Sequence, residues 1–320
     1  MEEEKGMKIR VSYGTAIMLG LKRGQMLARP TTAYFMTYHE GRCINNCAFC
    51  VQARKSRADV EKLSRITWPV FDLKDVVSKL EKTKFARLCI QTIDYPGLKE
   101  DVVAILESLS PIGLPASLSI TPVEEASLKT FKKLGVDYIG VGLDAASEEV
   151  YNKVKDSWYS WSEMWNFAKD VIKIFGERKA FIHLIFGLGE TEEAFLSTIQ
   201  EAYDIGAEVS IFAFTPIKGT ALENKTAPSL YRYRLMQIGL YLIKNGIKRV
   251  EDFEFRRGMI VDFGFSQEEL LEVLSERVFM THGCPGCNRP YYNEKPSKEP
   301  YNFPVKPEKE YLNKLLKNLF

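Results

Sequence analysis

The chain has 320 residues, of which 45% are hydrophobic and 27% charged, and these proportions are typical of a folded globular protein. Its 44 basic and 42 acidic residues leave a net charge of +2, too little to gather nucleic acid or an anionic membrane. The start, MEEEKGMKIR, lacks the apolar core of a secretory signal, and no apolar run reaches the roughly 18 residues of a membrane helix. We therefore expect a cytoplasmic protein with no nucleic-acid or membrane partner. Its six cysteines should then be thiols or metal ligands rather than disulfides.

Residues 1–30 predict a helical lead-in that docks on a core through Ile17, Met18 and Leu19. Short apolar runs then alternate with longer amphipathic ones, which predicts a parallel sheet with right-handed crossovers. The predicted strands are 31–38, 85–92, 116–120, 138–144, 181–188 and 209–216, and the predicted helices are about 73–83, 98–109, 122–134, 147–155, 161–176, 191–205 and 229–245. Six strand–helix units favour an α/β fold, a partial (βα)6 TIM-type barrel, over a doubly wound sheet.

The pattern changes after about residue 247, where RVEDFEFR and GMIVDFGF could form two more strands. Residues 280–307 carry six prolines and a C-x2-C pair, so this stretch should lie over the surface as an extended wrap without helix or ladder hydrogen bonds. The end, KEYLNKLLKNLF, predicts an amphipathic helix. We therefore expect a lead-in at 1–30, a barrel at 31–247, and a C-terminal extension at 248–320 with a C-x2-C flap and a terminal helix.

Three cysteines, Cys43, Cys47 and Cys50, lie in the loop RCINNCAFC after the first predicted strand. In a parallel α/β barrel that loop opens on the catalytic face. The spacing C-x3-C-x2-C lets one loop give three thiolates to three irons of a cubane and leave the fourth iron open, with Phe49 as an aromatic wall. Two alternatives remain: a zinc site completed by His39, and three buried core cysteines.

This loop resembles the signature of the radical SAM superfamily, C-x3-C-x-aromatic-C, and the resemblance covers roughly residues 31–220. It implies a 4Fe-4S cluster whose open iron chelates the amino and carboxylate groups of S-adenosylmethionine. One electron into the cluster would break the sulfonium bond and release a 5′-deoxyadenosyl radical. The cofactor carries this chemistry, and the protein positions and shields it. No residue is expected to act as a general acid or base, because an unactivated C–H bond has no acidic proton.

The resemblance also implies contacts to S-adenosylmethionine at the ends of the later strands. The Gln91-Thr92 backbone would meet the methionine amino group, and Asp144 in GLDAASEEVY would bind the ribose hydroxyls. FGLGET and FTPIKGTALE would lie near the adenine. The full set of implied cofactor-binding residues is Phe49, Gln91, Thr92, Asp144, Ile185, Gly187, Glu190, Phe214 and Thr215. Asp144 alone could equally be the cap of the helix that follows.

Three further cysteines suggest a second cluster. Cys284 and Cys287 form a C-x2-C turn in HGCPGCNRPYYNE, and Cys89 lies inside the second predicted strand. Folded over the barrel mouth, the pair could meet Cys89 at an auxiliary iron–sulfur cluster, with a weak fourth ligand from His282, a serine or tyrosine hydroxyl, or a substrate. Alternatively, Cys89 is a small buried hydrophobe, and the pair is half of a zinc knuckle or a redox pair.

The barrel resembles the biotin synthases, because Cys89 matches their cluster-ligating cysteine and GLGET is shared. The other ligands of that cluster are not found, since the third predicted strand offers Ser117 and Ser119 instead. The combination is most similar to a subunit of the archaeal-type two-component lipoyl synthases. That resemblance implies sulfur insertion into an octanoyl chain on a lipoyl carrier protein, a second radical SAM subunit, and a low-potential electron donor such as ferredoxin.

The residues after the C-x2-C pair are expected to line the substrate channel or tether the flap; they are Arg289, Tyr291, Tyr292 and Asn293. Their alternative is a polar surface turn. Residues 231–234, YRYR, are expected to be the solvated first turn of a helix rather than a nucleic-acid patch. Three other functions stay open: biotin-like sulfur insertion on a small molecule, a radical tRNA-modifying enzyme, and a non-enzymatic metal-binding protein.

Overall fold

A computed structural model describes residues 6–80 and 85–317, and its centre is one eight-stranded sheet in the order β10-β9-β8-β7-β6-β2-β1-β5. The strands of this sheet are β1 (Lys8–Val11), β2 (Thr32–Thr37), β5 (Val70–Asp72), β6 (Arg87–Gln91), β7 (Ala116–Ser119), β8 (Val136–Asp144), β9 (Ala180–Phe186) and β10 (Glu208–Ala213). The run from β2 to β10 is parallel throughout, whereas β1 is antiparallel to both β2 and β5. All carboxyl ends of the parallel strands therefore meet at one edge.

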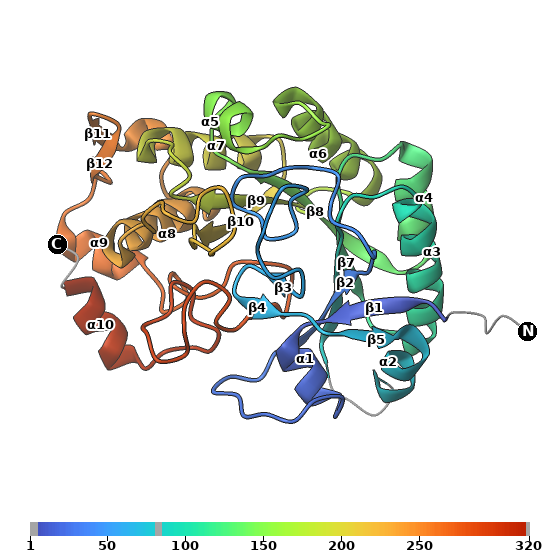
Figure 1. Cartoon of the computed structure of the whole chain (residues 1–320). Helices are drawn as coiled ribbons and strands as arrows, with labels where there is room; N and C mark the ends of the chain where they lie inside the picture. Colours follow the sequence, from blue (N-terminus) through green and yellow to red (C-terminus); the bar gives the residue numbers. More distant parts are fainter. Residues whose placement is uncertain (1–5, 81–84, 318–320) are drawn as a thin grey trace, which may run out of the picture.

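Amphipathic helices connect the parallel strands and cover the outside of the curved sheet (Figure 1). These helices are α2 (Leu73–Leu80), α3 (Leu98–Leu109), α4 (Glu125–Lys133), α5 (Glu148–Val154), α6 (Trp161–Phe175), α7 (Glu192–Asp204) and α8 (Leu230–Lys244), with a short 3-10 turn at Ser110–Ile112. Ser147, Ser160, Thr191 and Ser229 cap the last four, since each hydroxyl accepts a hydrogen bond from a backbone N–H in the first turn. Polar caps at these positions explain why the helix starts could be read from the sequence.

The partial barrel of six parallel strands is confirmed, and each predicted strand and helix of the barrel has its counterpart. Residues 81–83 of the first predicted helix lie outside the described residues. The lead-in, expected to be helical, contains α1 (Tyr13–Met18) but also β1, which extends the sheet. Ile9 and Val11 of β1 are buried in the core. A hairpin of two-residue strands, β3 (Lys62–Leu63) and β4 (Ile66–Thr67), was not predicted.

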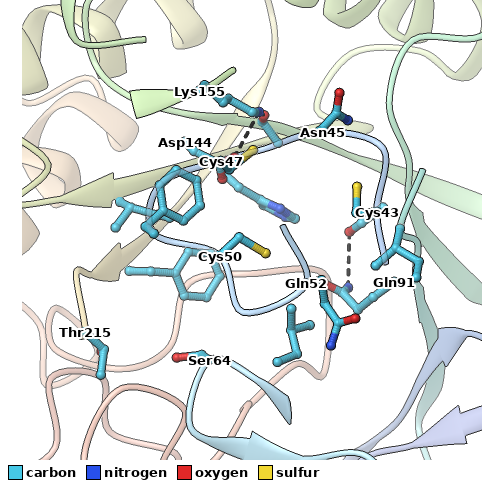
Figure 2. A pocket seen from close by; sticks show the side chains of 18 of the residues that line it. Cys43, Asn45, Cys47, Cys50, Gln52, Ser64, Gln91, Asp144, Lys155 and Thr215 are labelled. Atoms are coloured by element: carbon cyan, nitrogen blue, oxygen red, sulfur yellow. Dashed lines mark hydrogen bonds and ion pairs between the residues drawn. The ribbon is translucent and has the colours of Figure 1, made fainter. Parts of the chain in front are cut away.

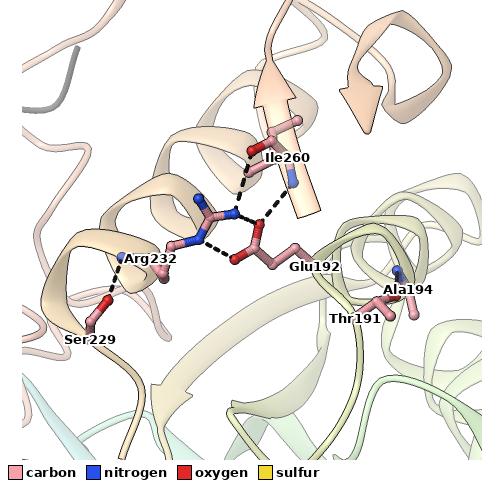
Figure 3. A network of polar contacts seen from close by, with 6 residues as sticks. All are labelled: Thr191, Glu192, Ala194, Ser229, Arg232 and Ile260. Atoms are coloured by element: carbon pink, nitrogen blue, oxygen red, sulfur yellow. Dashed lines mark hydrogen bonds and ion pairs between the residues drawn. The ribbon is translucent and has the colours of Figure 1, made fainter. Parts of the chain in front are cut away.

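The C-terminal extension begins with the predicted hairpin, now seen as β11 (Glu254–Arg256) and β12 (Met259–Asp262), after a 3-10 turn at Val250–Asp252. An unpredicted helix, α9 (Gln267–Val273), follows it. Figure 3 shows how the hairpin is held: the buried Glu192 carboxylate at the start of α7 pairs with Arg232 of α8 and accepts the Ile260 N–H at 2.9 Å. One carboxylate therefore joins α7, α8 and β12.

The prediction of a solvated first turn at residues 231–234 is wrong for three of the four side chains. Arg232 binds Glu192, and Tyr233 and Arg234 are 0% and 1% exposed. Arg234 donates to the Pro300 carbonyl at 2.5 Å, and its guanidinium lies over the Phe279 ring at 4.8 Å. The C-terminal segment covers this face of α8, and a single helix pattern carries no sign of that cover.

Residues 281–308 form a wrap of turns and bends with one bridge at Phe303. Its expected place over the surface is wrong in part, because Asn288, Asn293 and Glu294 are buried. The terminal helix α10 (Lys309–Lys317) follows with Leu316 buried. Residues 318–320 lie outside the described part. Figure 1 shows this orange-red segment running beside β3 and β4; Ser64 and Arg65 donate to the carbonyl groups of Tyr292 and Tyr291 at 3.4 and 3.3 Å. Within residues 6–80 and 85–317, no helix combines the length and apolar character needed to cross a bilayer.

Candidate functional site

A cavity of about 250 Å³ lies at the carboxyl edge of the parallel strands, bordered by the three-cysteine loop, the strand ends and the C-terminal wrap. Figure 2 shows Cys43, Cys47 and Cys50 on the loop after β2, facing this space. Ligand sites of parallel α/β barrels form at this edge because the strand-to-helix loops converge there. The position predicted for the three-cysteine loop is therefore the one observed.

Backbone hydrogen bonds fix the loop to its neighbours. Cys43 N–H donates to the Gln52 carbonyl at 3.0 Å, and Ala48 N–H donates to the Val154 carbonyl at 2.8 Å. The Asp94 N–H donates to the Cys43 sulfur at 3.3 Å. Burial raises the pKa of the Cys50 thiol to about 12 and also raises the pKa of Cys43 and Cys47. Bound iron would have to hold these thiols in their deprotonated form.

The geometry fits a cluster better than a zinc ion. His39, the proposed fourth zinc ligand, stacks its ring on Tyr95 with 4.6 Å between centroids and 5° between planes. In the described residues, no three His, Cys, Asp or Glu side chains converge as ligands of a single ion would. Three thiolates on three different irons lie farther apart than the ligands of one ion, and the adjoining cavity leaves room for a small molecule. The residues present therefore fit the predicted cluster and its open iron.

Seven of the nine residues predicted to bind S-adenosylmethionine line this cavity. They are Phe49, Gln91, Thr92, Asp144, Ile185, Phe214 and Thr215. Gly187 and Glu190 do not line it: the Glu190 carboxylate folds back and accepts the Gly187 and Gly189 N–H groups at 2.5 and 2.9 Å. Glu190 therefore shapes the turn after β9, while cofactor binding by the other seven stays a prediction.

Asp144 has a partner that the sequence did not reveal. It ends β8 with a left-handed φ of +66°, and its Oδ2 lies 2.9 Å from Nζ of Lys155, the residue after α5. Lys155 also donates to the Gly142 carbonyl. Burial lowers the Lys155 pKa, but the charges of Asp144 and Cys47 outweigh it and leave that pKa raised. Ser147 caps α5, so the alternative of Asp144 as the helix cap is excluded.

The other three thiols also meet inside the barrel. Gln91 donates to the Cys89 sulfur at 3.2 Å, and the Tyr34 hydroxyl lies 3.3 Å from the Cys287 sulfur. Burial raises the pKa of Cys89 to about 11 and that of Cys284 to about 12; Cys287 also raises both pKa values, and Cys89 raises that of Cys284. Cys287 thus lies beside Tyr34 of β2 and Cys284 beside Ser117 of β7, the two residues that pair with Cys89 in the sheet, while a cluster held by all three thiols stays a prediction.

The place of this meeting differs from the prediction. The Pro285 carbonyl accepts a hydrogen bond from Arg87 Nε at 3.2 Å, and the Gly286 carbonyl accepts one from Thr31 at 2.5 Å. Arg87 begins β6 and Thr31 precedes β2. The C-x2-C turn therefore lies against the amino ends of the strands, and its predicted position over the barrel mouth is wrong. A barrel of six strands does not close on itself, and the C-x2-C turn enters it at the amino ends of the strands.

The structure shows which candidate fourth ligands of the predicted auxiliary cluster lie near its cysteines. Ser117 forms a hydrogen bond with the Cys284 thiol, and Tyr34 adjoins Cys287. His282 lies near Lys244 of α8; burial first, and then that positive charge, lower its pKa to about 4. Among the described residues, no three His, Cys, Asp or Glu side chains form a single-ion site, whether with His282 or with Cys89. Of the candidates, the hydroxyl groups are the ones beside the thiols.

The four residues after the pair both line cavities and tether the wrap. The Arg289 guanidinium lies 4.1 Å from the Tyr292 ring centroid and 5.3 Å from that of Phe212. Asn293 donates to the Ala213 carbonyl at 2.7 Å. Arg289, Tyr292 and Asn293 border the cofactor cavity, whereas Tyr291 borders a second cavity. The alternative of a polar surface turn does not hold for these residues.

Comparison with known proteins agrees with this geometry. The family model described as "Radical SAM superfamily" matches residues 37–202. The biotin synthase of Persephonella marina is 29% identical over 189 residues, which cover 57% of this chain and 54% of that protein. The biotin synthase of Aliarcobacter butzleri is 28% identical over 176 residues, covering 50% and 56%. The match thus spans little more than half the length of these relatives.

Solved structures share the fold at low identity. Methylornithine synthase has a TM-score of 0.52 at 18% identity, over 65% of this chain and 60% of that one. The FeFe-hydrogenase maturase HydG from Carboxydothermus hydrogenoformans has a TM-score of 0.50 at 18% identity, over 87% and 63%. Together, the matched family model, the three-cysteine loop and the partial barrel show that this chain belongs to the radical SAM superfamily and is related to the biotin synthases.

Proposed function

We propose that this radical SAM enzyme inserts sulfur into an unactivated carbon, and that its substrate is an octanoyl chain on a lysine of a lipoyl carrier protein. The observation that carries the proposal is the placement of a second set of thiols in the same barrel as the first: Cys89 lies on β6 between Tyr34 and Ser117, which adjoin Cys287 and Cys284. An auxiliary iron–sulfur cluster held there would be the sulfur source. A second radical SAM subunit and a ferredoxin-like electron donor belong to the same proposal.

When bound, the first cluster and S-adenosylmethionine supply a 5′-deoxyadenosyl radical that can take hydrogen from such a carbon. The chain's own contribution is position. Gln91 connects the two sets of thiols, because it borders the cofactor cavity, donates to Cys89, and accepts from Arg289 at 3.4 Å. Groups held in fixed places avoid the entropic cost of encounter, provided that the reacting atoms approach to about 3–3.5 Å.

The weak hydroxyl surroundings of the second set also suit a donor role. Ser117 and Tyr34 are the polar groups beside Cys284 and Cys287, and an oxygen is a poorer iron ligand than a thiolate. A cluster with three strong ligands and one weak one gives up sulfide more easily than a fully thiolate-bound cluster. The structure of this second site therefore supports consumption of a cluster rather than electron transfer through it.

The test uses the full chain, purified without oxygen and reconstituted with iron and sulfide. Incubation with dithionite, S-adenosylmethionine and an octanoyl-lysyl peptide should yield 5′-deoxyadenosine and a peptide heavier by sulfur. Cys47→Ala should abolish both products, whereas Cys284→Ala should keep 5′-deoxyadenosine and lose the mass gain. Deoxyadenosine formation without any mass gain, with the partner subunit present, would count against the lipoyl-type reaction.

A second candidate, sulfur insertion into a small molecule, is favoured by the sequence matches, which are to biotin synthases. It keeps the same two sets of thiols and needs no carrier protein. The desulfurised precursor of biotin, offered in the same assay in place of the peptide, separates the two. Sulfur gain by the small molecule and not by the peptide would establish this second candidate.

A further inference from the structure

A second cavity, of about 900 Å³, lies beside α1 and the loop that follows it. Its wall is largely apolar, formed by the side chains of Ile17, Met18, Met26, Leu27, Ile66 and Trp68. Prolines and tyrosines of the C-terminal wrap close another side. No carboxylate borders the cavity in the described part of the chain, and its charged side chains are Arg29 and Arg289. This lining suits an uncharged aliphatic ligand, and the volume is within the range of ligand sites, about 300–1,000 Å³.

One residue of the cavity wall, Tyr34, adjoins the second set of thiols. The Tyr34 hydroxyl lies 3.3 Å from the Cys287 sulfur. Arg289 and Tyr292 border both this cavity and the cofactor cavity, so these two side chains form the partition between them. A chain that lies in this cavity is therefore separated from Cys287 by Tyr34 and from the cofactor cavity by Arg289 and Tyr292.

The outer end is cationic and exposed. Lys22, Arg23 and Arg29 are exposed on the loop after α1, and residues 12–38 contain no aspartate or glutamate. Leu27, 75% exposed, projects from the same loop. Leu27 is thus an exposed apolar side chain surrounded by positive charges. Such a surface suits an acidic protein that presents an apolar group, because opposite charges favour and steer association.

We propose that this second cavity is the access channel for an unbranched acyl chain, and that the loop of residues 20–30 docks the acidic carrier domain that bears it. The proposal rests on the sulfur-insertion function and specifies the route of its substrate. The acyl chain lies along Ile17, Met18 and Met26 and reaches Tyr34. The carrier stays outside, against Lys22, Arg23 and Leu27.

Binding measured by fluorescence anisotropy tests the route without turnover. The probe is a labelled acidic peptide whose central lysine carries a butanoyl, hexanoyl or octanoyl group, with the full reconstituted chain and no reductant. If the chain lies in an apolar channel, removal of two methylenes should weaken binding by about fifteenfold. A diazirine at the acyl end should crosslink to α1, residues 24–30 or Tyr34.

Met26→Trp fills the channel, and Met259→Trp, on β12, is its matched control. Met26→Trp should remove the chain-length dependence of binding, whereas the control should leave it unchanged. Leu27→Glu and Arg23→Glu, on exposed positions, should weaken binding of the acidic peptide about tenfold, and Lys133→Glu on α4 less than twofold. An unchanged fifteenfold step in Met26→Trp, or a crosslink at the carboxyl edge of the barrel instead, overturns the channel.

Two outcomes separate this channel from the function on which it rests. Equal sulfur gain by the octanoyl peptide with wild type and Met26→Trp overturns the channel and leaves the lipoyl-type reaction standing. Chain-length-dependent binding that Met26→Trp abolishes, in a wild-type chain that adds no sulfur, overturns the reaction and supports the channel as an acyl site.

Discussion

Replacement of Lys155 by methionine should destabilise the chain by about 3 kcal/mol. The Lys155 and Asp144 side chains are 7% and 19% exposed, and their charged atoms lie 2.9 Å apart. Two unit charges at that distance attract by about 6 kcal/mol in an effective dielectric of 20, and desolvation of both groups offsets part of this. Removal of one partner of a buried pair costs about 3–5 kcal/mol, and the partial exposure of Asp144 favours the lower end.

Urea unfolding of the metal-free protein at neutral pH measures this loss. Asp144→Asn removes the charge that Lys155→Met leaves unpaired, so the double variant should be more stable than the sum of the single losses implies, by about 2 kcal/mol. Lys129→Met is the matched control, because Lys129 and Glu125 form a pair whose side chains are 60% and 39% exposed. That control should lose less than about 0.5 kcal/mol.

The same variants test whether the pair shapes the cofactor cavity. Lys155→Met frees Asp144 and removes the donor to the Gly142 carbonyl, so binding of S-adenosylmethionine should weaken as well. The buried ion pair would be refuted if Lys155→Met lowered the free energy of unfolding no more than Lys129→Met does. It would also be refuted if the losses of the two single variants simply added in the double variant. If cofactor binding weakened while the losses of unfolding free energy simply added, Lys155 would contact S-adenosylmethionine directly rather than position Asp144.

Three further measurements follow from the site. Reconstituted wild type should hold about eight irons per chain and Cys284→Ala about four; a wild-type value near four would contradict a second cluster. Burial lowers the His183 pKa to about 4, so the folded state does not take the proton that an unfolded histidine takes below about pH 6.5. The free energy of unfolding should therefore decrease as the pH is lowered. From about pH 7.5 to 5.5, wild type should lose about 1.4 kcal/mol more of it than His183→Asn does. Gly187→Ala should cost about 1–2 kcal/mol in thermal unfolding, because φ there is +105° and a Cβ would lie 3.0 Å from Pro228; an unchanged midpoint would contradict this.

The barrel could be predicted because each of its elements carries its own local signal. Buried parallel strands are short apolar runs, and Ser or Thr before an amphipathic run starts a helix, as at Ser160 and Thr191. Strand β1 has four residues, and β3 and β4 have two each. Elements of two residues hold a single period of the strand pattern, and β1 lies in a segment read as helical, so their pairing partners in space define them.

The site residues also differ in whether a local sequence signal identifies them. Cys43, Cys47 and Cys50 could be found because one loop supplies all three and their spacing is a property of the sequence. Lys155 could not, because its approach to Asp144 depends on where α5 ends relative to a bulge in β8. The meeting of Cys89 with Cys287 was expected from residue type alone, whereas its place at the amino ends of the strands depends on tethers such as Arg87 to Pro285.

The open side of the barrel explains why two sets of thiols can serve one reaction. In the described residues β10 has no sheet partner beyond β9, and the C-terminal wrap contacts both ends of the strands: Asn293 donates to Ala213 at the carboxyl end of β10, and the Gly286 carbonyl accepts from Thr31 before β2. The wrap thus runs inside the barrel from the amino ends to the carboxyl ends, and it fixes Cys287 and Arg289 relative to the three-cysteine loop. A substrate cannot come between the two sets through the strands, which are hydrogen-bonded from β5 to β10. The proposed route therefore follows the wrap, beside which lies the apolar cavity that Tyr34 lines.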